Sequence, residues 1–196
     1  HYNITYWIPG KHEYYHSDIS KRSGTVNEKI RDNVFIVNNT TVNRGKVCFL
    51  FSTLWTKIGP GHQVELRIRY SDFRVIKSGG RPYSINHYNL MHEKCLSFLS
   101  DELKIQRRGP VIVVSHHVPT FSNYPEEYYG DPMNEAFAVE LSDLILSGQP
   151  AYWIYGHLHS NKGEFNIGKT ILATNQLGYV SYHEQEGFDP GKIIVI

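Results

Sequence analysis

The chain has 196 residues, 40% of them hydrophobic, and a formal net charge of +1 at pH 7. This length suits one domain with a core of its own, and we expect a single domain over residues 1–196. The near-neutral charge argues against nucleic acid or a membrane as a generic partner, and no apolar stretch reaches the roughly 20 residues of a spanning helix. Cys48 and Cys95 are too few for a disulfide framework, so we expect reduced core thiols and a cytoplasmic protein.

The chain opens with an apolar run at residues 4–8, which predicts a short strand. A polar stretch with sparse apolar positions follows at residues 17–32. It predicts a helix with Ser17 or Asp18 as its N-cap, because short polar side chains accept hydrogen bonds from the first backbone N–H groups of a helix.

Two further apolar runs, at residues 34–37 and 45–51, flank the turn-rich residues 38–44 and predict a β-hairpin. Residues 59–86 contain a Gly-Pro-Gly and a Gly-Gly-Arg-Pro segment around a short amphipathic piece. We expect an irregular excursion over the functional site there, and not a second domain.

The second half of the chain alternates helical and strand patterns. Apolar residues recur at helical spacing over residues 90–103, with Asn86 as N-cap, and again over residues 137–145. Apolar runs predict strands and a late hairpin, at residues 111–114, 152–155, 164–174 and 193–196. The whole pattern predicts an α/β (α+β) fold in which helices cover a mixed sheet or two stacked sheets.

Three of the apolar runs end on histidine. His12 follows the first strand, His116 and His117 follow the strand at residues 111–114, and His157 and His159 follow the strand at residues 152–155. In extended backbone the side chains at i and i+2 point the same way, so His157 and His159 are expected to address one locus. Only one of His116 and His117 is expected to face inward. Imidazoles gathered at strand ends predict a metal site, and the alternative is a set of loop or core histidines without a ligand.

The residues Gly10-Lys11-His12-Glu13, Ser115-His116-His117 and Gly156-His157-Leu158-His159 resemble, in this order, the motifs of the calcineurin-like metallophosphoesterases. Residues 52–56, 130–137 and 175–179 are similar to stretches in small bacterial members of that family. The resemblance covers the whole chain. It implies a four-layer sandwich of two mixed β-sheets flanked by helices, and hydrolysis of phosphate mono- or diesters at a two-metal centre.

The resemblance also implies roles for particular residues. His116 and His157 would bind one metal ion and His159 the other, with Mn, Zn, Fe and Mg as the candidate metals. His12 would contact the scissile phosphate and protonate the leaving oxygen, which suits a side chain that titrates near neutral pH.

The chain departs from the family pattern at two places. The Asp-x-His and Gly-Asp-x-x-Asp motifs are absent, because the chain starts where the third motif is expected, so we expect the N-terminal portion of the fold to be missing. In the third motif the usual Asn ligand is replaced by Lys11, whose ammonium has no acceptor and cannot ligate a metal. Lys11 would instead hold a phosphate electrostatically, and the chain would bind one metal ion or none.

Two functions therefore stay open. One is a metal-dependent hydrolase acting on a phosphate-ester small molecule or a phosphoprotein. The other is a catalytically inactive relative that binds a phosphate ligand or serves as a scaffold. Sheet edges left uncovered by the missing strands would also allow a homo-oligomer.

Overall fold

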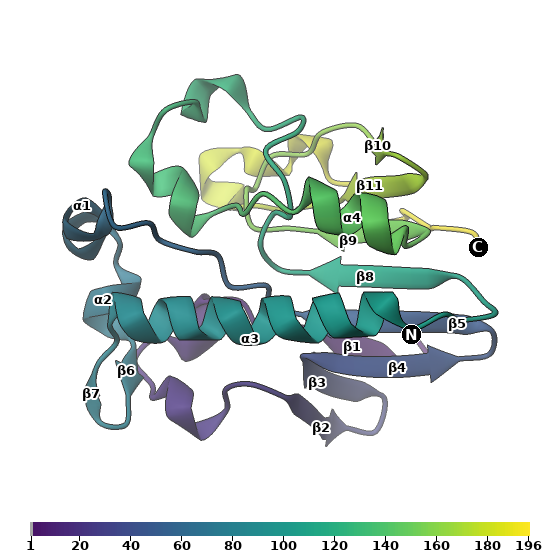
Figure 1. Ribbon diagram of the computed structural model, residues 1–196, viewed down its shortest axis with the longest axis horizontal. Coiled ribbons are helices and arrows are strands. Elements are labelled where there is room, and N and C mark those ends of the chain that lie inside the picture. Colours follow the sequence, from purple (N-terminus) through teal and green to yellow (C-terminus); the bar gives the residue numbers. More distant parts are fainter. Residues whose placement is uncertain (1) are drawn as a thin grey trace.

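The computed structural model describes residues 2–196, which form two mixed β-sheets with helices packed on them (Figure 1). The larger sheet has the strand order β10-β11-β9-β8-β5-β4, formed by Phe165–Ile167, Thr170–Thr174, Tyr152–Tyr155, Val111–Ser115, Val47–Ser52 and Thr40–Arg44. The smaller sheet has the order β1-β3-β2, formed by Thr5–Trp7, Val34–Asn38 and Val26–Arg31. These sheets confirm the predicted fold class.

Strands β5, β8, β9 and β11 run parallel to one another, and β4 and β10 are antiparallel edge strands. The parallel strands are apolar and buried, as expected for a sheet covered on both faces. Their carboxyl ends therefore meet at one edge of the sheet, and the loops that follow them lie together.

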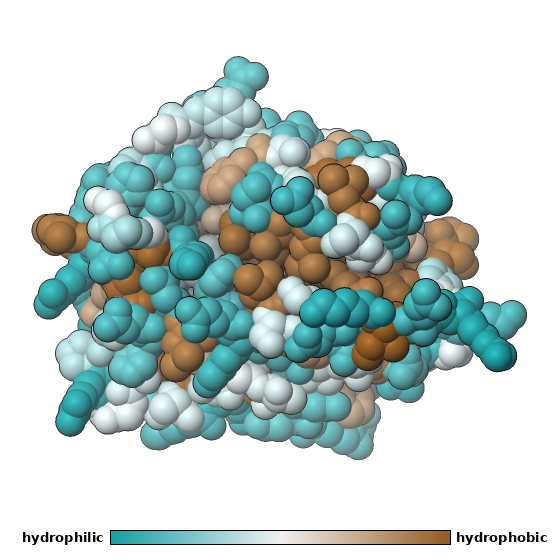
Figure 2. Space-filling view, viewed as in Figure 1, coloured by the Kyte–Doolittle hydropathy of each residue, from teal (hydrophilic) through white to brown (hydrophobic). Residues whose placement is uncertain are grey.

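Alternate residues of β5 pack against different layers. Leu50 belongs to the same buried cluster as Leu99 of α3 (Ile85–Lys104). Phe51 faces the other way, and its ring lies 4.9 Å from that of Tyr6 in β1. Helix α4 (Ser142–Gly148) packs beside α3, and in Figure 1 it lies in front of the larger sheet. Figure 2 shows a gathering of apolar side chains on the face of the molecule where these helices lie.

Helix α3 confirms the helix predicted over residues 90–103 but begins earlier. Its N-cap is Ser84 and not Asn86, since the Ser84 hydroxyl accepts a hydrogen bond from the His87 N–H at 3.3 Å. Its buried stripe includes Met91, Cys95 and Leu99, at the spacing of one helix face.

Residues 17–32 do not form the predicted helix. Asp18 caps only a short 3-10 turn, Ile19–Lys21, through the Ser20 N–H at 3.0 Å. Strand β2 follows and pairs antiparallel with β3. The expected hairpin of residues 34–37 and 45–51 is also wrong, because Asn39 takes a left-handed φ of 44° and the chain crosses there into the larger sheet as β4.

The excursion at residues 59–86 contains α1 (Gln63–Arg69), α2 (Asp72–Val75) and a small hairpin of β6 (Lys77–Ser78) and β7 (Arg81–Pro82). The predicted hairpin at residues 164–174 is confirmed as β10 and β11. Residues 193–196 form no strand and are largely exposed. The remaining helical turns are His12–Tyr14, Glu126–Tyr128, Pro132–Ala136, Val180–Tyr182 and Glu184–Gly187. Across residues 2–196, the helices all lack the combination of length and apolar character that a bilayer crossing needs.

Candidate metal centre

The carboxyl ends of β8 and β9 bring three histidines together. His116 and His117 follow β8 directly, and His157 follows β9 after Gly156, whose N–H donates to the His116 carbonyl at 3.2 Å. A ligand atom from each of these three imidazoles lies within 4.8 Å of the other two. Their ring centroids are 4.4 to 4.8 Å apart. The cluster therefore results from the parallel pairing of two neighbouring strands.

His117 is fully buried, and its tautomer is fixed by a backbone carbonyl. Its Nδ1–H donates to the Thr53 oxygen at 3.0 Å, which leaves the lone pair of Nε2 pointing away from that bond. The Nε2 atoms of His116, His117 and His157 are all buried, and none has a hydrogen-bond partner. Unpaired buried polar atoms are costly, and three lone pairs gathered in one place fit the binding of a metal ion.

Burial also keeps these imidazoles neutral. It lowers the pKa of His117 to about 3 and the pKa values of His116 and His157 well below the usual range, and Lys11 acts in the same direction. A neutral imidazole with a free lone pair is the form that binds a metal ion. The three side chains thus fit a divalent ion of the zinc type, with a fourth position left open.

Gly10 makes room for His116. A Cβ atom at this position would lie 2.4 Å from Cε1 and 2.7 Å from Nε2 of the His116 ring. The turn is held by Glu13, whose carboxylate accepts the Gly10 N–H at 2.7 Å. The glycine is therefore required by the close approach of the first loop to the imidazole.

His159 lies apart from this cluster. The backbone between the two histidines is not extended, since His157 and His159 both take left-handed φ angles, 78° and 56°. Nδ1 of the His159 ring pairs with the Glu184 carboxylate at 2.9 Å. The backbone N–H of His159 donates to the side-chain oxygen of Gln176 at 2.8 Å. Glu184 was not identified from the sequence, because it lies in a polar stretch with no motif.

All the predicted site residues nevertheless face one cavity of about 260 Å³. His116, His157 and His159 line it together with Lys11 and His12. Burial and the neighbouring Lys11 lower the pKa of His12. The centroid of the His12 ring lies 4.7 Å from that of the Tyr15 ring. His117 is not among the lining residues, but its ring packs against those of His116 and His157.

Lys11 sits against aromatic rings. Its Nζ lies 4.4 Å from the ring centre of Tyr70 and 5.1 Å from that of Phe137. Burial lowers the pKa of Lys11, and the buried carboxylate of Asp72 opposes that shift. Asp72 accepts a hydrogen bond from the Tyr15 hydroxyl at 2.8 Å. Asp72, which begins α2, was not identified from the sequence, because no motif marks it.

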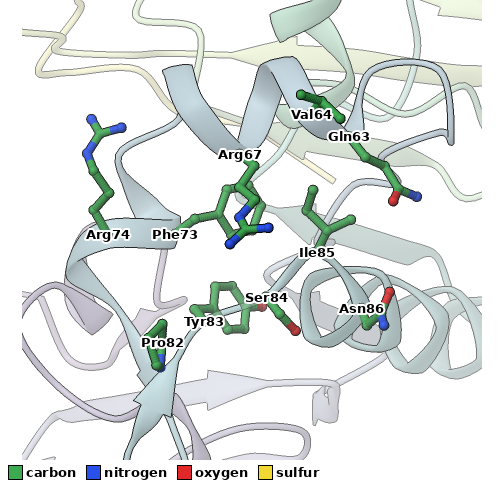
Figure 3. A pocket seen from close by; sticks show the side chains of 10 residues that line it. All are labelled: Gln63, Val64, Arg67, Phe73, Arg74, Pro82, Tyr83, Ser84, Ile85 and Asn86. Carbon is green, nitrogen blue, oxygen red and sulfur yellow. The ribbon is translucent and has the colours of Figure 1, made fainter.

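A second cavity, of about 600 Å³, lies between α1, β7 and the start of α3 (Figure 3). Its wall combines Phe73 and Tyr83 with the cations Arg67 and Arg74. None of its lining residues is a histidine, cysteine, aspartate or glutamate. Of these two cavities, the histidine cavity is therefore the one with metal-ligating side chains.

Comparisons with known proteins identify the family and the fold of this chain. The model of the calcineurin-like phosphoesterase family matches residues 1–161. Uncharacterized protein L509 of Acanthamoeba polyphaga mimivirus is 30% identical over an alignment of 208 positions, and the alignment covers 96% of this chain and 72% of that protein. The crystal structure of phosphopantetheinyl hydrolase from Mycobacterium tuberculosis has a similar fold, with a TM-score of 0.63 at 12% identity over 98% of this chain and 78% of that one. These matches confirm the resemblance drawn from the histidine motifs.

Proposed function

The chain belongs to the calcineurin-like phosphoesterase family, and we propose that it hydrolyses phosphate esters with a divalent ion held by His116, His117 and His157. The observation that carries this proposal is the set of three buried Nε2 atoms without hydrogen-bond partners. An ion bound by all three would remove the cost of burying them unpaired. Three imidazoles favour Zn²⁺, Mn²⁺ or Fe²⁺ over Mg²⁺, which prefers oxygen ligands.

The other side chains of the cavity supply the chemistry that a phosphate ester needs. A divalent ion at the imidazoles would act as a Lewis acid and lower the pKa of bound water. Lys11 holds the phosphate oxygens by charge. His12 donates a proton to the leaving oxygen as its bond to phosphorus breaks, while a water oxygen forms the new bond to phosphorus and the proton that this water loses passes to the solvent. The negative charge of the phosphate raises the pKa of His12, so substrate binding favours the protonated acid.

His159 has a separate part in the proposal. The family pattern predicts it as a ligand of a second ion. Because its Nδ1 is engaged by Glu184, Nε2 is the atom that remains for a second ion or for a phosphate oxygen.

Metal content and turnover test this proposal together. The chain is loaded with Zn²⁺ or Mn²⁺, freed of excess ion, analysed by elemental mass spectrometry, and assayed with 4-nitrophenyl phosphate and bis(4-nitrophenyl) phosphate. We expect about one tightly held ion per chain and hydrolysis of at least one ester. His117→Phe should remove both, whereas His87→Phe, at an exposed position on α3, should change neither. A chain that holds no ion, or a His117→Phe variant that binds like the wild type, would contradict the proposal.

A second candidate function is phosphate binding without turnover, and Lys11 favours it. A lysine stands where the family has a metal ligand, and within residues 2–196 no carboxylate joins the imidazole cluster. On this alternative, inorganic phosphate binds without any ester being hydrolysed, and Lys11→Ala weakens that binding. Phosphate affinity unaffected by Lys11→Ala would count against it.

We also propose a substrate class, an oligomeric state and a cellular localisation from the sequence. The substrate is a phosphate-ester small molecule or a phosphoprotein, and a homo-oligomer is compatible with the exposed strand edges. Cys48 and Cys95 are free and buried, which fits the reducing environment of the cytoplasm.

A further inference from the structure

We propose that a cavity beside the histidine site is a subsite for an aromatic group, so that the substrates are aryl phosphate esters. This inference rests on the proposed function, which puts the phosphate at Lys11 and His12. The subsite has a volume of about 250 Å³, and its wall is formed by Tyr124, Tyr128, Asp131, Met133, Asn134, Phe137 and Leu158.

The two cavities adjoin each other. Tyr128, Phe137 and Leu158 line both of them. Leu158 stands between His157 and His159 in the chain, so the wall of the subsite is built on the same loop as the metal-binding imidazoles. A group attached to a phosphate in the histidine cavity therefore extends directly into the subsite.

The lining suits a flat apolar group. Tyr124 is buried, and its hydroxyl is already used by Asn134 at 3.2 Å. Tyr128 is 42% exposed and meets Tyr124 edge-on at 6.3 Å between ring centres. An apolar cavity of about 150 Å³ holds benzene in a protein core, so the subsite has room for a substituted ring. A bound ring would cover Tyr128 in the tilted or offset geometry that aromatic pairs prefer.

Charge sets the orientation of the substrate. Each cavity has one carboxylate in its lining, and each carboxylate is paired, Glu184 with His159 at 2.9 Å and Asp131 with Arg69 at 3.2 Å. The cation Lys11 lines the histidine cavity and not the subsite, so a phosphate is attracted to the first cavity more than to the second. The ring therefore lies in the subsite and the phosphate beside the imidazoles.

Two ligands that cannot be hydrolysed test this assignment, phenylphosphonate and methylphosphonate. Their affinities for the Zn²⁺-loaded chain are measured by calorimetry. The chain has two methionines, of which Met133 lines the subsite and Met91 lies on the buried face of α3. With ¹³C-methyl methionine, NMR reports ring occupancy at Met133 and provides an internal control at Met91.

We expect phenylphosphonate to bind about 10-fold more tightly than methylphosphonate, equivalent to about 1.4 kcal/mol. The Met133 signal should shift with phenylphosphonate and with phenol but not with methylphosphonate, and Met91 should not shift. Tyr128→Ala should abolish the preference for the ring, whereas Tyr129→Ala, at the neighbouring residue outside the cavity, should keep it.

Equal affinities with an unmoved Met133 signal would overturn the subsite. If neither phosphonate binds, the proposed function fails, and phenol alone decides the subsite. A Met133 shift with phenol would then support an aromatic site, and the absence of a shift would overturn it.

Discussion

Replacing Gly10 with alanine isolates the contribution of His116 to metal binding. The new Cβ atom would lie 2.4, 2.7 and 2.8 Å from Cε1, Nε2 and Nδ1 of the His116 ring. Real Cβ atoms essentially never approach another heavy atom so closely, so the ring or the loop must move. Gly10 has no left-handed φ, so the substitution adds no backbone strain of its own.

The size of the effect follows from the required movement. Cε1 of His116 has to retreat by about 1 Å to reach an ordinary van der Waals contact of 3.4 Å. Metal–ligand distances tolerate only about ±0.2 Å, so such a shift removes His116 from the ligand set. Losses of 10- to 100-fold in metal affinity follow even from changes around a ligand, and we expect about 100-fold here, or about 3 kcal/mol.

Zinc affinity is measured by competition with a chromogenic chelator, and the integrity of the fold by thermal unfolding without metal. Gly61→Ala is the matched control, because a Cβ there meets nothing within 4 Å. The result that would refute the reasoning is a Gly10→Ala chain that binds zinc as tightly as Gly61→Ala. A weak site in both variants would refute it equally.

Three further predictions concern metal, packing and pH. Zn²⁺ at 100 times its dissociation constant should stabilise the wild type by about 2.7 kcal/mol, and thermal unfolding should show no such gain for His117→Phe. Gly109→Ala should cost about 1–3 kcal/mol in urea unfolding, because its Cβ would lie 1.7 Å from the Lys46 carbonyl oxygen, and an unchanged midpoint would contradict this. Partial burial raises the pKa of Glu140, but hydrogen bonds from neighbours such as the Thr120 hydroxyl outweigh it and the pKa is lowered. Glu140→Gln should therefore lower the free energy of unfolding by up to about 1 kcal/mol above pH 4.5, the usual pKa, and by less as the pH falls. Urea unfolding at several pH values measures this, and a difference that stays constant with pH would argue against a role of the ionised carboxylate.

Much of the site could be predicted because it depends on local sequence. The apolar runs of β8 and β9 end at Ser115 and Tyr155, and the histidines follow within two residues. Parallel pairing of these strands then fixes the meeting point of His116 and His157. Short buried strands are recognisable from composition alone, and so is the edge of the sheet at which their loops gather.

His117 was undervalued for a physical reason. In a strand, neighbouring side chains face opposite ways, so only one of His116 and His117 was expected to face inward. The strand ends at Ser115, however, and alternation no longer applies beyond it. The carbonyl of Thr53, directly after β5, accepts hydrogen bonds from both the backbone and the side chain of His117 and turns the ring toward His157. That contact joins residues far apart in sequence.

The wrong elements have the same origin. Residues 26–31 read as part of a polar helix, yet they pair with β3, because the sheet offers a partner that local periodicity does not reveal. The left-handed turn at Asn39, which sends the chain from one sheet to the other, has no signal stronger than an asparagine. Long-range pairing outweighs local propensity at both positions.

The charges at the site explain why Lys11 makes metal binding depend on phosphate. A divalent ion held by three neutral imidazoles keeps its whole charge, because within residues 2–196 no carboxylate belongs to the cluster. Lys11 adds a further positive charge, and at about 4 Å with an effective dielectric near 20 each unit of like charge costs on the order of 4 kcal/mol. A phosphate dianion in the same cavity attracts both cations and reverses the sign of that cost. Ion and phosphate are therefore expected to bind cooperatively, each raising the affinity of the other by the same factor. A lysine in place of the usual asparagine thus favours the ion and phosphate together over the ion alone.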